Sequence, residues 1–300
     1  MDVLVAGSSG FIGSALLPAL TEAGHRPIRA LRQPSIPTGV DAIAWDPDAG
    51  VIDTASLEGI GAVINLAGVG IGDKRWTPSR KREILESRTT STRLLATAIS
   101  GLDSKPTVFV SGSAIGYYGG RADEILTEAS APGDDFLADV CVQWEAAAQP
   151  AVDAGIRVVT IRTGIVLGRD GGVLKKLLLP FRLGLGGRVA SGEQWMSWIS
   201  LHDEVAAILH ALRTESLRGP VNLTAPNPST NAEFTDALGK AVHRPTVLPT
   251  PLAPLKLRYG AELVQHLLVD GQRVLPKALE ASGFTFRHAT LTEALHAILG

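Results

Sequence analysis

The stretch Val3-Leu-Val-Ala-Gly-Ser-Ser-Gly-Phe-Ile-Gly13 opens the chain with a short apolar run and continues into a glycine pattern. The glycines stand at positions 7, 10 and 13, and Leu16, Leu17 and Leu20 then recur at helical spacing. This order predicts a buried strand, a tight turn and a helix whose N-terminus faces outward.

Each glycine in this turn has a separate physical role. Gly7 permits the turn, Gly10 lets backbone approach a pyrophosphate because it lacks a Cβ, and Gly13 lets the helix pack closely on its strand. Free N–H groups and the helix dipole favour phosphate at that end. The stretch therefore predicts a dinucleotide-binding turn, although similar turns also merely join a strand to a helix.

The second expected strand, residues 26–31, indicates which dinucleotide binds. At the end of this strand a carboxylate accepts from the ribose 2′-OH of NAD, whereas a cation accommodates the 2′-phosphate of NADP. The sequence offers Arg29 and Arg32, followed by a loop over residues 33–39, and has no carboxylate before Asp41. We expect NADP(H); the alternative is that both arginines are ordinary surface charges.

The remaining pattern predicts an α/β protein with a Rossmann-type doubly wound parallel sheet. Further strands are expected at 42–45, 62–68, 107–113 and 155–162, with helices at 75–100 and 139–152. After residue 170 the chain becomes glycine- and proline-rich, with helices near 173–182, 204–213, 231–242, 252–268 and 290–299. We expect an NADP-binding domain over 1–168, to which 200–225 returns, and a smaller mixed α/β substrate domain over 169–300.

Composition excludes several classes of function. Hydrophobic residues make up 45% of the chain, which is enough to form a buried core. The net charge is −2, so there is no electrostatic case for binding nucleic acid or an anionic membrane. Apolar runs are too short to span a bilayer, and the chain opens without a basic signal-peptide region. The single Cys141 fits a cytoplasmic protein, and the seven histidines lack ligand spacing, so no metal is expected.

Hydroxyl groups gather after the fifth expected strand. Ser111, Ser113, Tyr117 and Tyr118 follow its apolar core. Ligands of open α/β sheets bind outside the carboxyl ends of the strands, which makes Ser113, Tyr117 and Tyr118 candidate catalytic residues. The alternative is a plain passage from strand to loop.

Motifs along the whole chain resemble the extended short-chain dehydrogenase/reductases, and more narrowly their atypical epimerase-family subgroup. The wider resemblance rests on the glycine turn, Asn65-Leu-Ala-Gly68, Tyr118-Gly119 and Arg162-Thr-Gly-Ile-Val-Leu-Gly168. The narrower one rests on Lys74-Arg-Trp76, Ser87-Arg88, Gly112–Gly119, Leu179–Gly187, Ser197-Trp-Ile199, Ala225-Pro-Asn-Pro228, Asn231-Ala-Glu-Phe234 and Gly271-Gln-Arg-Val274.

The resemblance implies NADP(H) as cofactor and a set of residues around it. Arg32 is implied at the 2′-phosphate, and Glu83 and Arg88 near the cofactor, although solvated surface charges are the alternative for the last two. The implied cofactor-binding residues are Gly7, Ser9, Gly10, Phe11, Ile12, Gly13, Arg32, Leu66, Ala67, Gly68, Glu83 and Arg88.

The chain departs from the family where proton transfer occurs. Members use a Tyr-x-x-x-Lys pair, in which Tyr exchanges the proton and Lys lowers its pKa. If Glu145 is aligned with the glutamate that usually follows the pair, Leu137 and Cys141 stand in its place, and neither can act as that acid. Ser113 matches the family's Ser/Thr, which hydrogen-bonds the reacting oxygen.

Three functions remain open at this point. An oxidoreductase or epimerase acting on a small carbonyl or sugar-like substrate could take its proton from Tyr117, Tyr118 or the C-terminal half. The substrate or water could instead supply it while Ser113 polarises a carbonyl, or the protein could be a catalytically silent NADPH-binding redox sensor or regulator. Trp195 and Trp198 would line the substrate pocket or belong to the core, and a homodimer is one option for assembly.

Overall fold

The computed structural model describes residues 1–300 except 33–35 and 37–38, so most of the loop expected after the second strand lies outside the described residues. Eight strands form one sheet in the order β12-β8-β6-β5-β1-β2-β3-β4. Every neighbouring pair is parallel except β3 with β4. The strands are β1 (Asp2–Ala6), β2 (Arg26–Leu31), β3 (Ala42–Asp46), β4 (Val51–Ile52), β5 (Ala62–Asn65), β6 (Val108–Ala114), β8 (Arg157–Thr163) and β12 (Gly219–Leu223).

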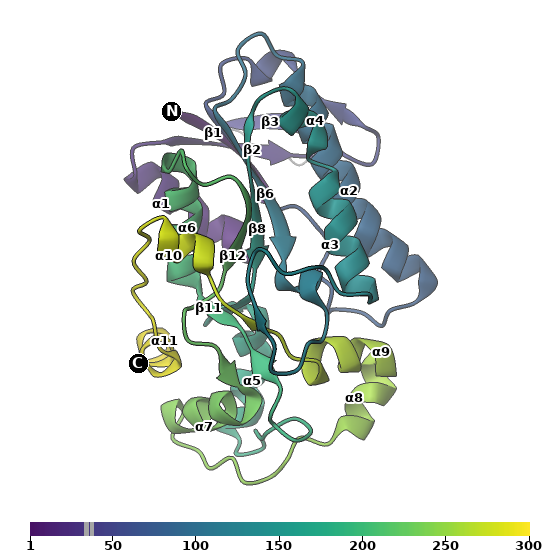
Figure 1. Ribbon diagram of the computed structural model, residues 1–300, viewed down its shortest axis with the longest axis vertical. Helices are drawn as coiled ribbons and strands as arrows, with labels where there is room; N and C mark the ends of the chain where they lie inside the picture. The colour runs from purple at the N-terminus through teal and green to yellow at the C-terminus, as the bar shows by residue number, and fades with distance from the viewer. Residues whose placement is uncertain (33–35, 37–38) are drawn as a thin grey trace.

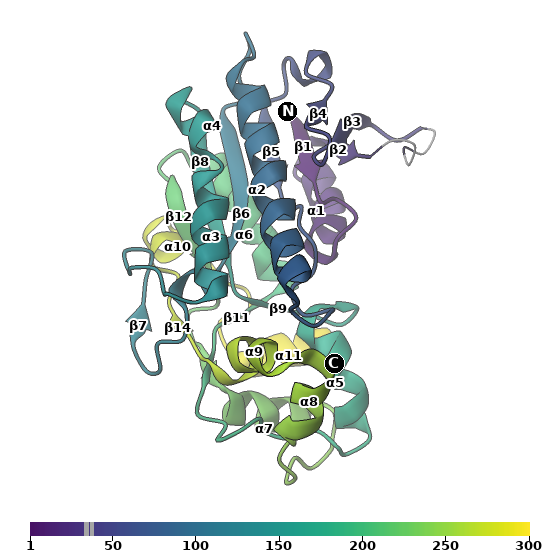
Figure 2. The same ribbon diagram turned by 90° about the vertical axis from the view of Figure 1, so that its right-hand side faces the viewer.

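Helices cover both faces of this sheet, which is why its central strands are apolar on both sides. Val3 and Val5 pack on the side of α1 and α6, whereas Leu4 and Ala6 pack on the side of α2 and α4. Figure 2 shows α2 and α3 side by side over one face. The helices are α1 (Phe11–Glu22), α6 (Leu201–Arg213) and α10 (Lys277–Ala281) on the first side, and α2 (Pro78–Ser100), α3 (Phe136–Ala146) and α4 (Gln149–Asp153) on the second. The predicted doubly wound fold is confirmed.

The strand order reverses direction at β1, whose neighbours are β2 on one side and β5 on the other. Connections from this point wind to opposite sides of the sheet, which leaves a crevice at the carboxyl ends of β1 and β5. Both the glycine turn after Ala6 and the step after Asn65 open into that crevice. The fold thus selects the location of the site.

A smaller C-terminal part lies beyond the carboxyl end of the sheet, in the lower half of Figure 1. Three two-stranded sheets help to join it to the main sheet: β9 (Ile165–Gly168) with β11 (Trp198–Ser200), β10 (Trp195–Met196) with β13 (Ser229–Thr230), and β7 (Ile125–Leu126) with β14 (Arg273–Val274). Its helices are α5 (Gly172–Arg182), α7 (Asn231–Ala241), α8 (Leu252–Tyr259), α9 (Ala261–Val264) and α11 (Leu291–Leu299). Trp198 is fully buried in the core of this part, beside α5, α7 and α11.

Two expected helices are divided in the structure. The helix expected at 139–152 is α3 followed by α4, where Pro150 occupies the first turn because it has no N–H to donate. The helix expected at 252–268 is broken by Gly260, whose φ of +93° suits glycine and not a helix. Its last residues form a π-helical turn, η3 (Gln265–Val269). Among the described residues, no helix combines the length and the apolar character needed to cross a membrane.

Candidate functional site

The glycine turn is packed so tightly that two of its glycines have no replacement. Gly7 has a φ of +77°, and a Cβ there would lie 2.6 Å from the carbonyl carbon and oxygen of Leu66. A Cβ on Gly13 would lie 2.2 Å from the Gly7 carbonyl oxygen. At Gly10 a Cβ would lie 3.2 Å from the Gly7 carbonyl oxygen, a tight contact, but Gly10 itself is exposed to solvent. The turn is therefore held against β5 by Gly7 and against α1 by Gly13.

The N-terminus of α1 points out of this turn without a side-chain cap. Gly10 is the N-cap residue and has no side chain that could accept hydrogen bonds from the first turn of the helix. The first N–H groups of α1 are therefore available to an anion. Ser9 is exposed beside them. The ring of Phe11 turns away into a cradle in which a Cβ on Gly168 or Gly171 would lie 2.6 or 2.1 Å from ring atoms. Because its ring is held there, Phe11 can offer a bound phosphate only its backbone.

The two arginines at the end of β2 have different partners. Nε of Arg29 donates to Oγ of Ser8 in the glycine turn at 3.1 Å. Arg32, which the sequence singled out, is exposed and donates to the carboxylate of Asp48 at 2.9 Å. A 2′-phosphate bound at this edge would therefore contact Arg29, which is hydrogen-bonded to the glycine turn, and Arg32, which is paired with Asp48.

Arg88 reaches the crevice from α2. Its side chain packs on Gly68, where a Cβ would lie 3.2 Å from Cγ and Cζ of the arginine, and its guanidinium stands 5.1 Å from the ring of Trp144. Nη1 donates to the backbone oxygen of Ile84 at 3.0 Å, and no carboxylate among the described residues pairs with it. Burial lowers the pKa of Arg88 to about 10, so it stays cationic at neutral pH. A partly buried cation without an anion is a binding element for phosphate or ribose oxygens.

The other implied cofactor residues divide into two groups. Leu66 offers its backbone to the turn and Ala67 donates its N–H to Oδ1 of Asn65 at 3.1 Å, so both lie at the crevice. Glu83 instead lies on the exposed side of α2 and accepts from Arg80 at 2.6 Å, a contact that holds the pKa of Glu83 below its usual range. The structure does not bring Glu83 to the glycine turn.

Ser113 is the first member of a buried polar network. Its hydroxyl donates to Oε1 of Glu145 at 2.7 Å, and Arg162 donates to both carboxylate oxygens at 2.8 and 3.0 Å. Burial alone would lower the pKa of Arg162, but the hydrogen bonds and charge of Glu145 raise it overall. A hydroxyl whose proton is directed at Glu145 can accept from a substrate but cannot also donate to a carbonyl. The expected role of Ser113 in polarising a carbonyl stays a prediction and would require this proton to turn from Glu145 toward the substrate.

Tyr118 extends the same network into the core. It is fully buried, and its hydroxyl accepts from Nη1 of Arg162 at 3.0 Å and donates to Oδ1 of Asn222 at 2.6 Å. Burial raises the pKa of Tyr118. Both hydrogen-bond partners of this hydroxyl lie inside the protein, and the catalytic role expected for Tyr118 stays a prediction.

Tyr117 differs from its neighbour in being partly exposed. Its ring lies under the guanidinium of Arg162, 3.4 Å from Cζ to the ring centroid, and stands edge-on to Tyr118. Its hydroxyl has no hydrogen-bond partner among the described residues. Of the two tyrosines, only Tyr117 is oriented with a free hydroxyl.

Sequence reasoning named Glu145 and Arg162 only as parts of motifs and did not mention Asn222. A signal was present, because Arg162 stands inside an otherwise apolar strand and a buried guanidinium needs a partner. Which carboxylate would meet it was decided by the docking of α3 on β6 and β8, not by spacing along the chain.

In α3, the helix that would carry the missing Tyr-x-x-x-Lys pair, neither of the two corresponding residues can serve as an acid or a base. Leu137 packs with Trp76, Val140 and Leu263 in an apolar cluster between this helix and the C-terminal part. Cys141 is buried, and its surroundings raise the thiol pKa to about 12. Neither residue can exchange a proton near neutral pH.

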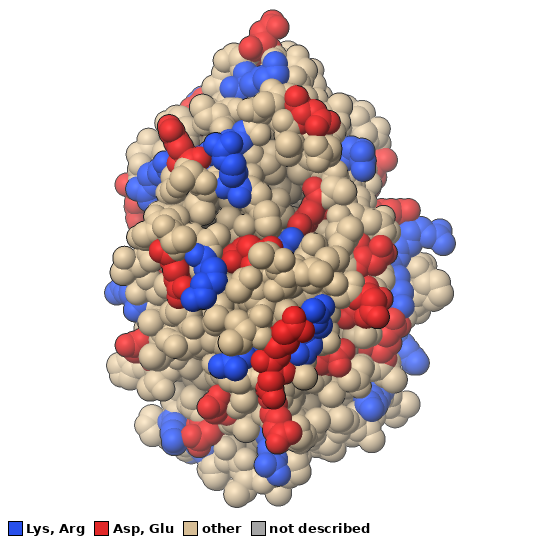
Figure 3. All heavy atoms as spheres, in the orientation of Figure 1, with Lys and Arg blue, Asp and Glu red and all other residues tan. Residues whose placement is uncertain are grey.

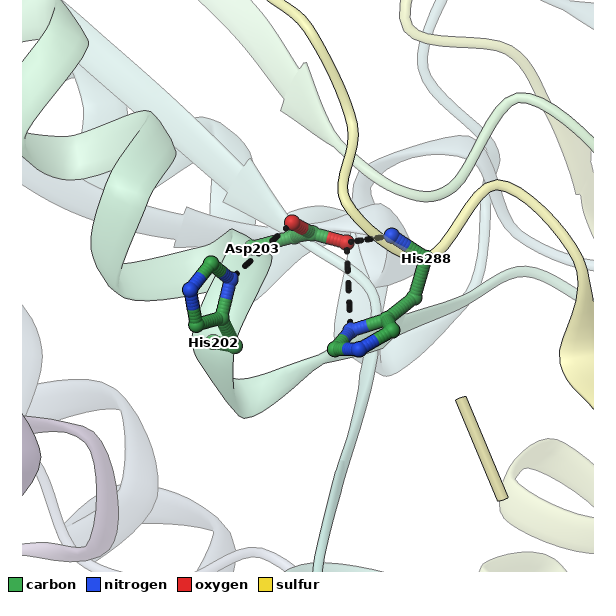
Figure 4. A group of neighbouring side chains, drawn as sticks. All are labelled: His202, Asp203 and His288. Carbon is green, nitrogen blue, oxygen red and sulfur yellow. Dashed lines mark hydrogen bonds and ion pairs between the residues drawn. The ribbon is translucent and has the colours of Figure 1, made fainter. Parts of the chain in front are cut away.

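At two places among the described residues, three side chains of metal-ligating type lie together, in each case with one member distant in sequence from the other two. In the first, shown in Figure 4, His202 and His288 flank Asp203. Asp203 already accepts the N–H groups of Arg287 and His288 at 3.0 and 2.9 Å, so its carboxylate fastens the 287–288 segment to α6. The second group consists of Asp135, His266 and Asp270. The sequence-based expectation of no metal stays a prediction.

A further buried acid follows Asp203 directly in α6. Glu204 on α6 is fully buried; Oε1 accepts from Thr163 at 2.9 Å, and Oε2 has no partner among the described residues. Burial raises the pKa of Glu204 to about 8. The carboxyl group therefore keeps its proton at neutral pH. On the face of the molecule in Figure 3, acidic and basic side chains are interspersed and form no basic stripe.

Comparison with known proteins agrees with the doubly wound fold and with a cofactor crevice at the glycine turn. A model of the NAD dependent epimerase/dehydratase family matches residues 3–223, and a domain of unknown function, DUF1731, matches residues 250–298. An epimerase family protein of Mycobacterium tuberculosis is 45% identical over 293 residues, covering 98% of this chain and 96% of that protein. The human epimerase family protein SDR39U1 is 37% identical over 302 residues, covering all of both chains.

The crystal structure of human SDR39U1 with NADPH superposes with a TM-score of 0.91 at 37% identity and covers 100% of this chain and 99% of that one. The chain therefore belongs to the NAD dependent epimerase/dehydratase family, in the atypical short-chain dehydrogenase/reductase group that carries DUF1731 at its C-terminal end. The resemblance drawn from the motifs is confirmed.

Proposed function

We propose that this protein binds NADP(H) in the crevice at the carboxyl ends of β1 and β5. The observation that carries the proposal is the glycine turn, in which Gly7 and Gly13 are sterically obligatory while Gly10 is exposed and the end of α1 is uncapped. Arg88 adds a cation without an anionic partner among the described residues. The human SDR39U1 structure was solved with NADPH, and this supports the phosphorylated cofactor.

Within this crevice the chain's residues have distinct tasks. The turn and Arg88 would hold the phosphate and ribose oxygens, and Arg29 and Arg32 would hold the 2′-phosphate. The cofactor supplies or accepts a hydride when bound. Residues 169–300 would form the substrate side, except that within the 200–225 segment β12 is a strand of the main sheet and α6 covers it.

We infer further that the protein is an oxidoreductase or epimerase acting on a small carbonyl or sugar-like substrate. The residue that supports this is Tyr117, whose partly exposed ring is fixed under Arg162 while its hydroxyl remains free. The guanidinium of Arg162 lies against the face of the Tyr117 ring and fixes its orientation. Tyr117 would exchange the proton in place of the missing pair.

A second function, an NADPH-binding sensor or regulator without catalysis, has its own supporting observation. The positions of the missing pair hold Leu137 within an apolar cluster and Cys141 with a thiol pKa of about 12. The proton of Ser113 is directed at Glu145, and Tyr118 is buried. The choice between an enzyme and an NADPH-binding protein without catalytic activity then depends on whether Tyr117 exchanges a proton.

Titration of the purified protein with NADPH and with NADH, followed by a panel of carbonyl compounds, tests both proposals. Tight NADPH binding with oxidation by a panel member supports the enzyme. Tight binding without turnover favours the sensor, and equal, weak binding of both dinucleotides contradicts the cofactor assignment. Gly13→Val, which would drive a side chain into the Gly7 carbonyl, should abolish binding; Gly101→Ala, whose Cβ would lie 3.8 Å from the nearest atom, the carbonyl oxygen of Ala98, is the control.

A further inference from the structure

The charges of this chain are unevenly distributed along it. Residues 171–192 and 237–261 together contain eight Lys and Arg and no Asp or Glu. The rest of the chain holds 20 Lys and Arg against all 30 Asp and Glu. A net charge near zero therefore conceals two basic, acid-free segments.

The fold places these two segments against each other. The N–H of Thr250 donates to the backbone oxygen of Arg188 at 2.8 Å, and the Thr250 hydroxyl donates to that of Gly187 at 2.8 Å. Nε of Arg244 donates to the backbone oxygen of Arg182 at 2.9 Å. In both Figure 1 and Figure 2 the loop over 243–250 lies at the lower end of the molecule, away from the parallel sheet.

Large apolar side chains project from the same two segments. They contribute six of the eleven exposed large hydrophobic residues among the described residues: Leu179 at 66%, Leu183 at 64%, Leu185 at 64%, Val247 at 86%, Leu248 at 61% and Leu257 at 82% exposed. Helix α8, within the second segment, buries none of its residues. We call the exposed side chains of 179–188 and 243–258 the leucine–arginine end of the molecule.

Most cations at this end lack a counter-charge. Lys176 pairs with Asp73 and Lys240 with Asp236, both at the margins. Within the part of the chain that the structure describes, Lys175, Arg182, Arg188, Arg244, Lys256 and Arg258 form no ion pair. Exposed leucines beside unpaired cations are the two components of binding to an anionic lipid surface.

We propose that the leucine–arginine end docks on an anionic phospholipid bilayer, with its leucines entering the interface and its arginines contacting lipid phosphates. A bilayer fits better than a protein partner because the exposed apolar side chains project from loops and from the ends of α5 and α8, beside unpaired cations. The two segments themselves carry cations and no acids, which suits a surface of negative charge. The sequence-based expectation of no membrane contact was drawn from net charge, which sums over both ends of the molecule.

Sedimentation of the full chain with lipid vesicles tests this proposal. The protein should bind vesicles of phosphatidylcholine mixed with phosphatidylserine with an apparent affinity at least about tenfold higher than vesicles of phosphatidylcholine alone. High salt should reverse this binding. Equal binding to both vesicle types, or none to either, would overturn the proposal.

Substitutions assign the binding to this end. Leu185→Ser with Leu248→Ser should abolish sedimentation, and Arg182→Gln with Arg244→Gln should lower it by about tenfold or more. The matched controls are Val152→Ser, at an exposed valine elsewhere, and Arg93→Gln on α2, which should bind as the parent does. Unchanged melting temperatures confirm folding, since all these side chains are exposed. A concentration-dependent dimer that the leucine changes dissolve, without vesicle binding, would show a self-association surface and refute the lipid assignment.

Discussion

Arg162 contacts both carboxylate oxygens of Glu145, at 2.8 and 3.0 Å, across the boundary between β8 and α3. The side chain of Arg162 is 4% exposed and that of Glu145 is 18% exposed, so water screens the pair poorly. This pair fixes the proton of Ser113 and the position of Tyr118. It is the point at which the sheet and the catalytic helix of the family are tied together.

Removal of the negative charge at this pair should destabilise the fold. Glu145→Gln leaves a buried guanidinium without its anion, and we expect the free energy of unfolding to fall by about 3 kcal/mol. Urea denaturation followed by circular dichroism measures the change. Glu86→Gln, at an exposed position of α2, should change stability by less than about 0.5 kcal/mol. Equal stability of the two variants would show that the pair is not important to folding.

Glu204 should make stability depend on pH in an identifiable direction. Its folded pKa of about 8 lies above the ordinary glutamate value of 4.5 because burial disfavours the charged form. The folded state thus keeps a proton that the unfolded chain releases, and stability should fall as pH rises from about 4.5 to 8. Relative to Glu204→Gln, which has no proton to lose, the melting temperature of the parent should decline across that window.

The matching control for this titration is Glu22→Gln, an exposed acid at the end of α1, whose melting temperature should follow that of the parent at every pH. A parent and a Glu204→Gln variant with parallel pH profiles would mean that the carboxyl group ionises freely in the folded state.

The 2′-phosphate assignment predicts unequal effects on the two dinucleotides. Arg32→Ala should weaken NADPH by about tenfold or more, since a charge-assisted contact is lost, and should leave NADH nearly unchanged. Asp48→Asn should tighten NADPH several-fold because Asp48 competes for Arg32. Calorimetric titration of each variant measures both effects. Equal losses for NADPH and NADH would reject Arg32, and Arg29→Ala then becomes the variant to compare.

Substitution of Tyr117 and of Tyr118 should distinguish a catalytic role from a structural one. With a panel compound that is turned over, Tyr117→Phe should lower kcat by about a hundredfold or more while NADPH affinity is kept. Tyr118→Phe should mainly lower stability, by about 1 kcal/mol, because Arg162 and Asn222 lose a buried hydrogen-bond partner. Full turnover by the Tyr117 variant would exclude it as the proton donor.

The local features of this protein could be predicted because they depend on near neighbours in the sequence. The turn at Gly7, the apolar strands and the covering helices follow from periodicity and from the absence of a Cβ at a few positions. The resemblance to the family implied the same cofactor class as the arginines at the end of β2 and exposed the missing pair. The helix expected over 252–268 was wrong where Gly260 adopts a positive φ, since a single glycine inside a helical pattern is ambiguous.

By itself, the sequence determined the doubly wound sheet, the phosphate turn and the loss of Tyr-x-x-x-Lys, because each is encoded in a contiguous pattern. Only the tertiary structure decided that Tyr118 is buried while Tyr117 is partly exposed, that the Ser113 hydroxyl donates a hydrogen bond to Glu145, and that two acid-free segments meet at one end. The physical reason is that burial and pairing depend on which distant residues the packed elements bring within a few ångströms, and spacing along the chain does not contain that information.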